Sequence, residues 1–319
     1  MSEQMHSTVK TVVLMGGESE EREISLLSGK NIQAALHEAG IEADAFDWHP
    51  NKMQAFLNAG YGRVFIALHG GSGENGMVQA MLEMAGIPFT GVRMRPAAIC
   101  MDKSVSKNLV SFTKVAVPGG VMKPVREIQA LWRENRAEAC WDEIVKQIGL
   151  PLVVKPARNG SSVGVSIVET RESMDSAVHS AALSDDEIVL FEQYISGYEL
   201  TVAMLNGKAL GVCQIVPKTK FYDYEAKYNR DDTEYLVPSS LGAEFDKELC
   251  RQAEIVAEAL DCTSGVVRID FLADKKLKPY FLEVNTVPGM TSHSLVPKIA
   301  AHAGFDFPTL CRMILEMAS

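Results

Sequence analysis

The stretch VVRIDFLADKKLKPYFLEVN, residues 266–285, decides the fold that we expect. It contains two runs of alternating polar and apolar residues around a lysine-rich turn, which is typical of a β-hairpin. Side chains two residues apart share one face of a strand, so Arg268 and Asp270 point together, as do Glu283 and Asn285. One face of the hairpin therefore carries two carboxylates, an amide and a guanidinium.

The position of the turn decides which of these side chains meet. A turn centred between Lys276 and Leu277 places Asp270 opposite Glu283, and the arginine opposite the asparagine. Unpaired carboxylates on neighbouring strands repel each other, and a hard cation with oxygen ligands relieves that repulsion. We therefore predict a magnesium ion that bridges these residues and substrate phosphates. The alternative, a solvated charged face, fits less well because the positions between are apolar.

The N-terminal third of the chain alternates strands and helices. Strands are expected at residues 11–15, 41–46 and 64–68. One expected helix has apolar positions at Ile24, Leu27, Ile32 and Leu36, and a second spans residues 77–85. Repeated strand–helix–strand units predict a parallel sheet with helices on both faces.

The rest of the chain mixes helices with hairpins. We expect a helix to begin at residues 102–104 and a joint at residues 117–120. Beyond the joint we expect helices at 141–148 and 173–183 and strands at 152–155, 165–168 and 188–192. Strands 200–205 and 209–216 flank Asn206-Gly207, a strong turn signal. The polar and aromatic segment 221–238 is too long for a plain connector, so we expect a lid.

The composition excludes several classes of function. The 319 residues are 47% hydrophobic and 23% charged, which excludes a mostly disordered chain. The net charge of −10 disfavours nucleic acid and anionic membranes as partners. No apolar run approaches the roughly 20 residues of a membrane helix, and the N-terminus lacks the pattern of a signal peptide, so we expect a cytoplasmic protein. The six scattered cysteines indicate reduced thiols rather than a zinc site or disulfides.

The segment KPARNGSSVG, residues 155–164, follows an expected strand. Its small residues let backbone N–H groups approach an anion, Ser161 and Ser162 add hydroxyl donors, and Lys155 adds charge. The segment is either a phosphate-binding loop or a flexible surface hairpin, and its residues alone leave both open. It is not a Walker A loop, because the chain contains no GxxxxGK[ST] pattern.

Acidic residues follow the first expected strand in GGESEERE, residues 16–23. Carboxylates in the first turn of a helix often only complement its dipole. A carboxylate at the carboxyl end of a parallel strand can also hold a substrate ammonium. His69 lies at the same end of the sheet, although a lone histidine there is more often structural.

Seven motifs together resemble the D-alanine–D-alanine ligase family. They are VVLMGGESEEREISLLSG, VFIALHGGSGENG, MDK, VVKPARNGSSVG, FYDYEAKY, RIDF and LEVNTVPGMTSHSLVP, spaced from residue 11 to residue 297. The resemblance implies an α/β and α+β protein with the ATP-grasp fold. It also implies an N-terminal α/β domain (1–100) and two subdomains (101–193 and 194–319) that sandwich ATP, with a lid loop at 218–238.

The resemblance also implies an activity. ATP phosphorylates the carboxylate of one D-alanine, and the amine of a second D-alanine attacks the acyl phosphate and releases phosphate, for peptidoglycan synthesis. One alternative is another ATP-grasp ligase, such as one that forms D-alanyl-D-lactate, but Tyr228 argues against the depsipeptide form. The other is a catalytically silent nucleotide-binding regulatory module, whose sequence would be expected to lose the metal residues or the lysines.

The site residues that the resemblance implies fall into four groups. Those for catalysis are Glu21, Ser161, Tyr228, Arg268 and Ser294, and those for substrate binding are Glu21, His69, Arg268, Gly289, Ser294 and Leu295. Those for ATP are Lys103, Lys155, Ser161, Ser162, Glu192, Gln193, Tyr194, Ile195, Glu199 and Lys227. Asp270, Glu283 and Asn285 would hold two magnesium or manganese ions. Gln193 departs from the lysine frequent in relatives, and a homodimer is the expected assembly.

Overall fold

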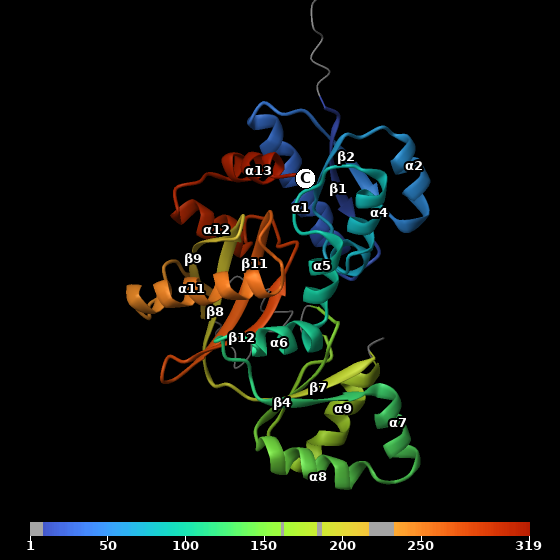
Figure 1. Ribbon diagram of the computed structural model, residues 1–319, viewed down its shortest axis with the longest axis vertical. Coiled ribbons are helices and arrows are strands. Elements are labelled where there is room, and N and C mark those ends of the chain that lie inside the picture. The colour runs from blue at the N-terminus through green and yellow to red at the C-terminus, as the bar shows by residue number, and fades with distance from the viewer. Residues whose placement is uncertain (1–8, 161–162, 184–186, 217–232) are drawn as a thin grey trace, which may run out of the picture.

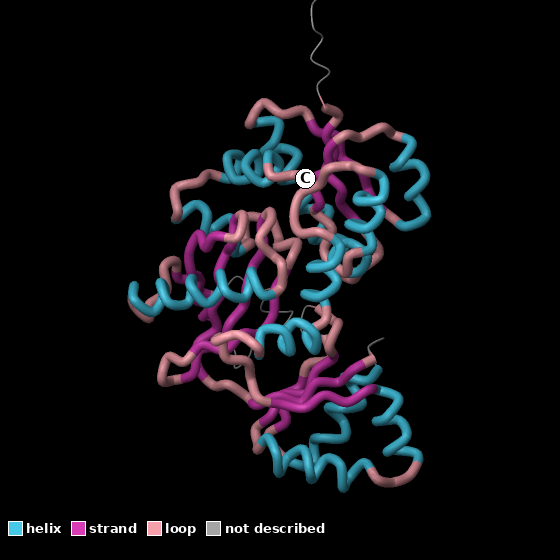
Figure 2. Tube along the Cα trace, in the orientation of Figure 1, coloured by secondary structure: helices cyan, strands magenta, loops and turns pink. Residues whose placement is uncertain are grey.

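The computed structural model describes residues 9–160, 163–183, 187–216 and 233–319, and its strands form three sheets. The sheets follow one another along the long axis of the molecule (Figure 1). The sheet of the N-terminal third lies at one end, the sheet of the middle third lies at the other, and the sheet of the last third lies between them (Figure 2). The middle of the chain is therefore an end of the molecule.

The N-terminal sheet is parallel, as the strand–helix pattern predicts. Its strands are β1 (Thr11–Gly16), β2 (Ala43–Trp48) and β3 (Arg63–Ile66), in the order β2-β1-β3. Its helices are α1 (Arg22–Glu38), α2 (Met53–Asn58), α3 (Gly71–Glu74) and α4 (Met77–Ala85). The expected strand at 41–46 begins two residues later, because Gly40 has a positive φ of 79° and the Ile41 N–H bonds back to Leu36. Ile41 thus belongs to the end of α1.

Helix α1 has two apolar environments. Ile32 and Leu36 are fully buried in the core, as their spacing predicts. Leu27 is 49% exposed, and together with Ile24 it lines the large cavity described below. Ile24 and Leu27 therefore face a cavity, whereas Leu26 beside them packs against the core.

The sheet of the middle third is antiparallel and has the order β4-β7-β5-β6. Its strands are β4 (Gly120–Pro124), β5 (Leu152–Pro156), β6 (Ser166–Val168) and β7 (Ile188–Gln193). Helices α7 (Val125–Arg133), α8 (Ala137–Ile148) and α9 (Met174–Leu183) cover one face around the buried Trp141 and Phe191. The joint expected at 117–120 leads directly into β4. This strand was not expected because it lies at the sheet edge and contains glycine and proline.

The sheet of the last third has the order β10-β9-β8-β11-β12. Its strands are β8 (Gly197–Leu205), β9 (Lys208–Val216), β10 (Glu234–Leu236), β11 (Val266–Asp274) and β12 (Pro279–Asn285), and α11 (Ala243–Ala259) covers one face. Both residues of the Asn206-Gly207 turn have positive φ, which confirms the predicted hairpin.

The expected lid at 218–238 needs a correction. Residues 234–236 form strand β10 and pair with β9, so this part of the segment belongs to the sheet. The aromatic motif at 221–228 lies outside the described residues.

Two pairs of helices connect the three sheets. Helices α5 (Met94–Met101) and α6 (Lys103–Ser111) follow the N-terminal unit, and Asp102 caps α6 by accepting the Ser104 and Val105 N–H groups. Helices α12 (Leu295–His302) and α13 (Phe307–Glu316) return to the N-terminal sheet and share its core (Figure 1). The division into three domains stays a prediction.

The longest helices in the described part of the chain, α1 and α11, have 17 residues each. None of the described helices is long and apolar enough to cross a membrane.

Candidate active site

A cavity of about 1030 Å³ lies where the three units meet. The middle sheet contributes Val153, Lys155 and Glu192 to its wall, and the last sheet contributes Arg268, Asp270, Leu272 and Glu283. The N-terminal unit adds Glu21, His69 and Glu74. All of the predicted site residues that the structure describes line this cavity. Four others, Ser161, Ser162, Lys227 and Tyr228, lie outside the described residues.

The β11–β12 hairpin has the predicted pairing at its functional end. Asp270 lies opposite Glu283, and Arg268 lies opposite Asn285. Nearer the turn, however, Phe271 pairs with Phe281, so the turn is centred on Lys276 rather than between Lys276 and Leu277. A β-bulge at the extra residue Leu282 restores the predicted pairing beyond it. The prediction of the pairing was right, but the predicted turn was not.

The two facing carboxylates are already neutralised by protein cations, which corrects the expectation of unpaired charges. Arg268 donates to both oxygens of Asp270, from Nε at 2.9 Å and from Nη2 at 2.8 Å. Thr201 Oγ1 donates to the same carboxylate at 2.6 Å. Lys103 Nζ, on α6, lies 3.1 Å from Glu283 Oε2. Repulsion between the carboxylates is therefore not by itself an argument for a metal.

A different observation favours a cation at this place. Asn285 Oδ1 is buried and has no hydrogen-bond partner among the described residues. A buried oxygen without a donor is costly, and a hard cation between Asp270, Glu283 and Asn285 would satisfy it. The described residues contain no group of three or more His, Cys, Asp or Glu side chains that could hold a metal, so the amide is an essential member of this set.

Two lysines contact Glu192 at the floor of the cavity. Lys155 Nζ lies 2.8 Å from Oε2, and Lys107 Nζ lies 2.5 Å from Oε1. Burial raises the pKa of Glu192, but the charges of the two lysines outweigh burial and lower it to about 2. Sequence reasoning missed Lys107. Its spacing of four from Lys103 places both lysines on one face of α6, and this signal could have found it.

The predicted adenine-binding residues connect β7 to β8. Gln193, Tyr194 and Ile195 follow Glu192 along the cavity wall, and Glu199 lies on β8 beside them. Leu272 and Leu282 add apolar surface from the opposite sheet. An aromatic and apolar slot with a few polar groups suits a purine ring.

Glu21 lies at the N-terminus of α1, close to two glycines. A Cβ at Gly70 would come within 3.2 Å of Glu21 Oε2, and one at Gly160 within 3.8 Å. The phosphate-loop candidate and the N-terminal unit therefore meet at Glu21. Its expected partners Ser161 and Tyr228 lie outside the described residues.

Glu74, which sequence reasoning also missed, lies on the same wall of the cavity. Burial, together with the charge of Glu21, raises its pKa to about 8. Its position after the loop that carries His69 was the available signal.

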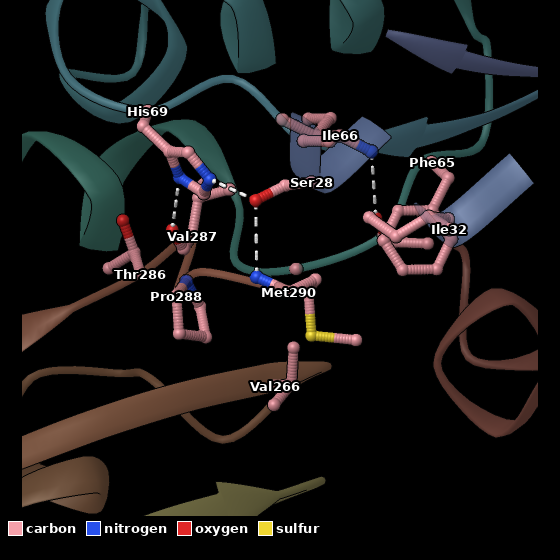
Figure 3. Close-up of a pocket in the computed structure, with 13 residues that line it drawn as sticks. Ser28, Ile32, Phe65, Ile66, His69, Val266, Thr286, Val287, Pro288 and Met290 are labelled. Carbon is pink, nitrogen blue, oxygen red and sulfur yellow. Dashed lines mark hydrogen bonds between the residues drawn. The ribbon is translucent and has the colours of Figure 1, made fainter. Parts of the chain in front are cut away.

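His69 contacts protein groups through both ring nitrogens (Figure 3). Nδ1 lies 2.9 Å from the Val287 carbonyl oxygen and must donate to it, and Nε2 lies 3.0 Å from Ser28 Oγ. Ser28 Oγ in turn accepts the Met290 N–H at 3.2 Å. The histidine therefore links the N-terminal unit to the segment after β12. This arrangement matches the structural role weighed for a lone histidine and leaves neither ring nitrogen for a substrate.

Gly289, Ser294 and Leu295 gather at the N-terminus of α12. A Cβ at Gly289 would lie 2.7 Å from Ser294 Oγ, so only glycine fits there without displacement. Ser294 is the N-cap residue, and its hydroxyl accepts the Thr291 N–H at 2.9 Å. The first N–H groups of a helix have no partner within the helix and favour an anion, which suits a substrate carboxylate.

The chain is similar to known proteins in sequence and in structure. The family model "D-ala D-ala ligase C-terminus" matches residues 117–316. A D-alanine–D-alanine ligase of Dechloromonas aromatica is 43% identical over 315 residues, which cover 99% of both chains. The crystal structure of the Bacillus anthracis D-alanine–D-alanine ligase complexed with ATP has a TM-score of 0.81 and 32% identity, covering 97% of this chain and 96% of that one. A D-Ala:D-Ser ligase of Enterococcus faecalis has the same TM-score at 28% identity, covering 97% of this chain and 98% of that one.

Proposed function

Because the chain belongs to the D-alanine–D-alanine ligase family, we propose that its large cavity binds ATP and two D-alanine molecules with the residues described above. The fold is the ATP-grasp fold, and the activity is the ATP-dependent ligation of two D-alanines for peptidoglycan synthesis. The observation that carries the residue assignment is the convergence of lysines, carboxylates and a helix N-terminus on one cavity.

ATP would lie between the two antiparallel sheets. Gln193, Tyr194 and Ile195 face the base, and Glu199 lies beside them. Lys103 from α6 and Lys155 from β5 both face the phosphates, which their charge stabilises as the phosphoryl group moves. Asp270, Glu283 and Asn285 would hold magnesium or manganese, and the metal would neutralise charge on the phosphate oxygens.

The two amino acids would lie toward the N-terminal unit. Glu21 binds the ammonium of the first D-alanine, whose carboxylate accepts the phosphoryl group of ATP and becomes an acyl phosphate. The N-terminus of α12, with Ser294 and Leu295, binds the carboxylate of the second D-alanine. The second amine, once deprotonated, attacks the acyl carbon. The tetrahedral intermediate then expels phosphate and forms the peptide bond.

Donors for the oxyanion would come from both sides of the acyl carbon. The Arg268 guanidinium has five N–H donors in a fixed plane, and part of that plane already binds Asp270. Asp270 thereby orients the guanidinium in advance, which favours stabilisation of developing charge. The backbone N–H of Gly289, a residue that lines the cavity next to Ser294, would be a second donor. Positioning and charge stabilisation suffice for this chemistry, and no protein nucleophile is needed.

Two further assignments complete this proposal. The protein acts in the cytoplasm, where ATP is available. It forms a homodimer through the exposed methionines of α4 and α5. Met77, Met84 and Met94 are 66%, 91% and 40% exposed, and an apolar surface of this kind suits a protein partner.

Product analysis tests the proposed function. Purified protein with ATP, magnesium and D-alanine should yield D-alanyl-D-alanine, ADP and phosphate in equal amounts by mass spectrometry. L-alanine should give no dipeptide. A product that forms only when D-lactate or D-serine is also supplied would assign the second site to another substrate. ADP release that does not depend on D-alanine would contradict the ligase assignment.

A further inference from the structure

Glu192 is held between two buried ammonium groups that come from different elements. Lys107 lies on α6, Lys155 on β5 and Glu192 on β7. Their side chains are 9%, 10% and 7% exposed. Each carboxylate oxygen of Glu192 contacts one ammonium. The three side chains together therefore carry one net positive charge when all are ionised.

Only part of this cluster faces the cavity. Lys155 and Glu192 line its wall, whereas Lys107 lies behind them and does not. Burial lowers the pKa of Lys107 to about 7, the charge of Glu192 opposes this shift, and the charge of Lys155 adds to it. The ion pair with Glu192 favours the charged form of Lys107, and Lys107 has no direct path to a ligand in the cavity.

The neighbouring charges leave this excess charge in place. Glu283 is the next carboxylate that acts on Lys155, and it is paired with Lys103. Asp270 is paired with Arg268. Each of these carboxylates is therefore paired with a cation other than Lys155, if Glu192 is assigned to Lys107.

We propose that Lys107 is a positioning residue of the nucleotide site, which neutralises Glu192 so that the charge of Lys155 remains available to a phosphate group. The proposal rests on the assignment of Lys155 to ATP phosphates under the proposed function. Without Lys107, Glu192 and Lys155 form a neutral buried pair, and the polyphosphate meets no net charge at this point. A neutral pair attracts an anion much less than a free ammonium does.

Lys107→Met tests this role, because methionine keeps an unbranched chain of similar length and removes only the charge. We expect the dissociation constant of a non-hydrolysable ATP analogue to rise about thirtyfold, which is about 2 kcal/mol of binding free energy. The dissociation constant of adenosine, which lacks phosphates, should stay within about threefold of wild type. The KM for D-alanine should change as little.

Three variants separate charge from packing and from general electrostatics. Lys107→Arg should restore most of the affinity for the ATP analogue, since it keeps the charge. Lys107→Gln keeps a hydrogen bond to Glu192 without the charge, so its affinity for the ATP analogue should match that of Lys107→Met. If Lys107→Met does not fold, Lys107→Gln takes its place. Lys114→Met removes an exposed lysine just beyond α6 and should leave the affinity unchanged.

Nucleotide binding is measured without turnover, so this test can fail separately from the proposed function. A protein that binds the ATP analogue through Lys107 but forms no dipeptide would refute the ligase assignment only. Equal losses of affinity for adenosine and for the ATP analogue would overturn the role of Lys107 and indicate a packing defect. Unchanged affinity for the ATP analogue in folded Lys107→Met would overturn it as well.

Discussion

The carboxylates of Asp270 and Glu283 face each other across two strands, and each has a protein cation beside it. Arg268 contacts Asp270 within its own strand, and Lys103 reaches Glu283 from α6. These cations keep the facing carboxylates compatible with a folded sheet before any metal binds. Under the proposed metal site, a metal would compete with Lys103 for Glu283.

Removing the charge of Glu283 should cripple turnover and spare the fold. Glu283→Gln deletes one anionic metal ligand, so we expect turnover at limiting magnesium to fall at least about a hundredfold. The lost ion pair with Lys103 is partly exposed, since Glu283 is 31% exposed, and costs at most about 1 kcal/mol. Steady-state ADP release and thermal unfolding measure the two effects.

Glu244→Gln provides the matched control for this variant. Glu244 is exposed in the first turn of α11 and does not line the cavity. It should change neither turnover nor the dependence on magnesium. Magnesium should also strengthen ATP-analogue binding less in Glu283→Gln than in wild type. Normal turnover of Glu283→Gln at low magnesium would refute the assignment of Glu283 as a metal ligand.

At the scale of elements, α12 is the helix whose N-terminus lines the cavity. Ser294 caps it in an extended conformation, with φ −70° and ψ 144°, and Leu295 is its first helical residue. The backbone N–H of Leu295 is one of the donors left free by the helix. Its side chain, by contrast, is buried in the core shared with the N-terminal sheet.

Leu295→Pro removes this N–H while keeping the helix. Proline suits the first helical position, and the extended backbone of Ser294 suits a residue before proline. We expect the KM for the second D-alanine to rise about tenfold more than in Leu295→Ala, which loses side-chain packing but keeps the N–H. The two variants should unfold at similar temperatures. Equal KM values for the second D-alanine in both variants would refute the assignment of the Leu295 N–H to the substrate carboxylate.

In the β11–β12 hairpin, a β-bulge changes the pairing between the turn and the functional end. The turn is centred on Lys276, so a regular ladder would set Leu282 opposite Asp270. The bulge at Leu282 brings Glu283 to that position instead. Both Leu282 and Glu283 then line the cavity, one with an apolar group and one with a carboxylate.

At the scale of the whole molecule, the Ser28–His69 pair connects the N-terminal unit to residues 287–290 (Figure 3). These residues lead into Gly289 and the N-terminus of α12. The arrangement of the N-terminus of α12 therefore depends on contacts between the first and last thirds of the chain. The shared core of α1, α12 and α13 stabilises the same interface.

This interface should make the stability of the protein depend on pH through His69. Burial lowers the pKa of His69 below its usual value of about 6.5. Below pH 6.5 the unfolded chain binds a proton that the folded protein excludes, so stability falls as the pH decreases and is unaffected above that range. Wild type should lose more stability than His69→Gln, by up to about 1.4 kcal/mol, when the pH is lowered from 7.5 to 5.5.

Denaturant unfolding at both pH values measures this difference. His302→Gln is the matched control, because His302 is exposed at the end of α12. It should lose as much stability on acidification as wild type. A His69→Gln variant that responds to acid like wild type would show that His69 is protonated in the folded state.

The sequence by itself determined the parts of the protein that depend on local periodicity. The alternation in residues 266–285 predicted which side chains share a face, and the structure places Arg268 and Asp270 together on the cavity side. Strand–helix repeats predicted the parallel N-terminal sheet, and Asn206-Gly207 predicted its hairpin. Motif resemblance identified the family, which the comparisons confirm.

Only the tertiary structure decided which charges meet. Lys103 contacts Glu283 across 180 residues of sequence, and Lys107 contacts Glu192 across 85. His69 pairs with groups on both sides of it in the chain, and the bulge at Leu282 responds to the strand opposite. Periodicity reports how a side chain is oriented on its own element, because that orientation follows from local backbone geometry. Which element packs against that face depends on the burial of the whole core, and no local pattern encodes it.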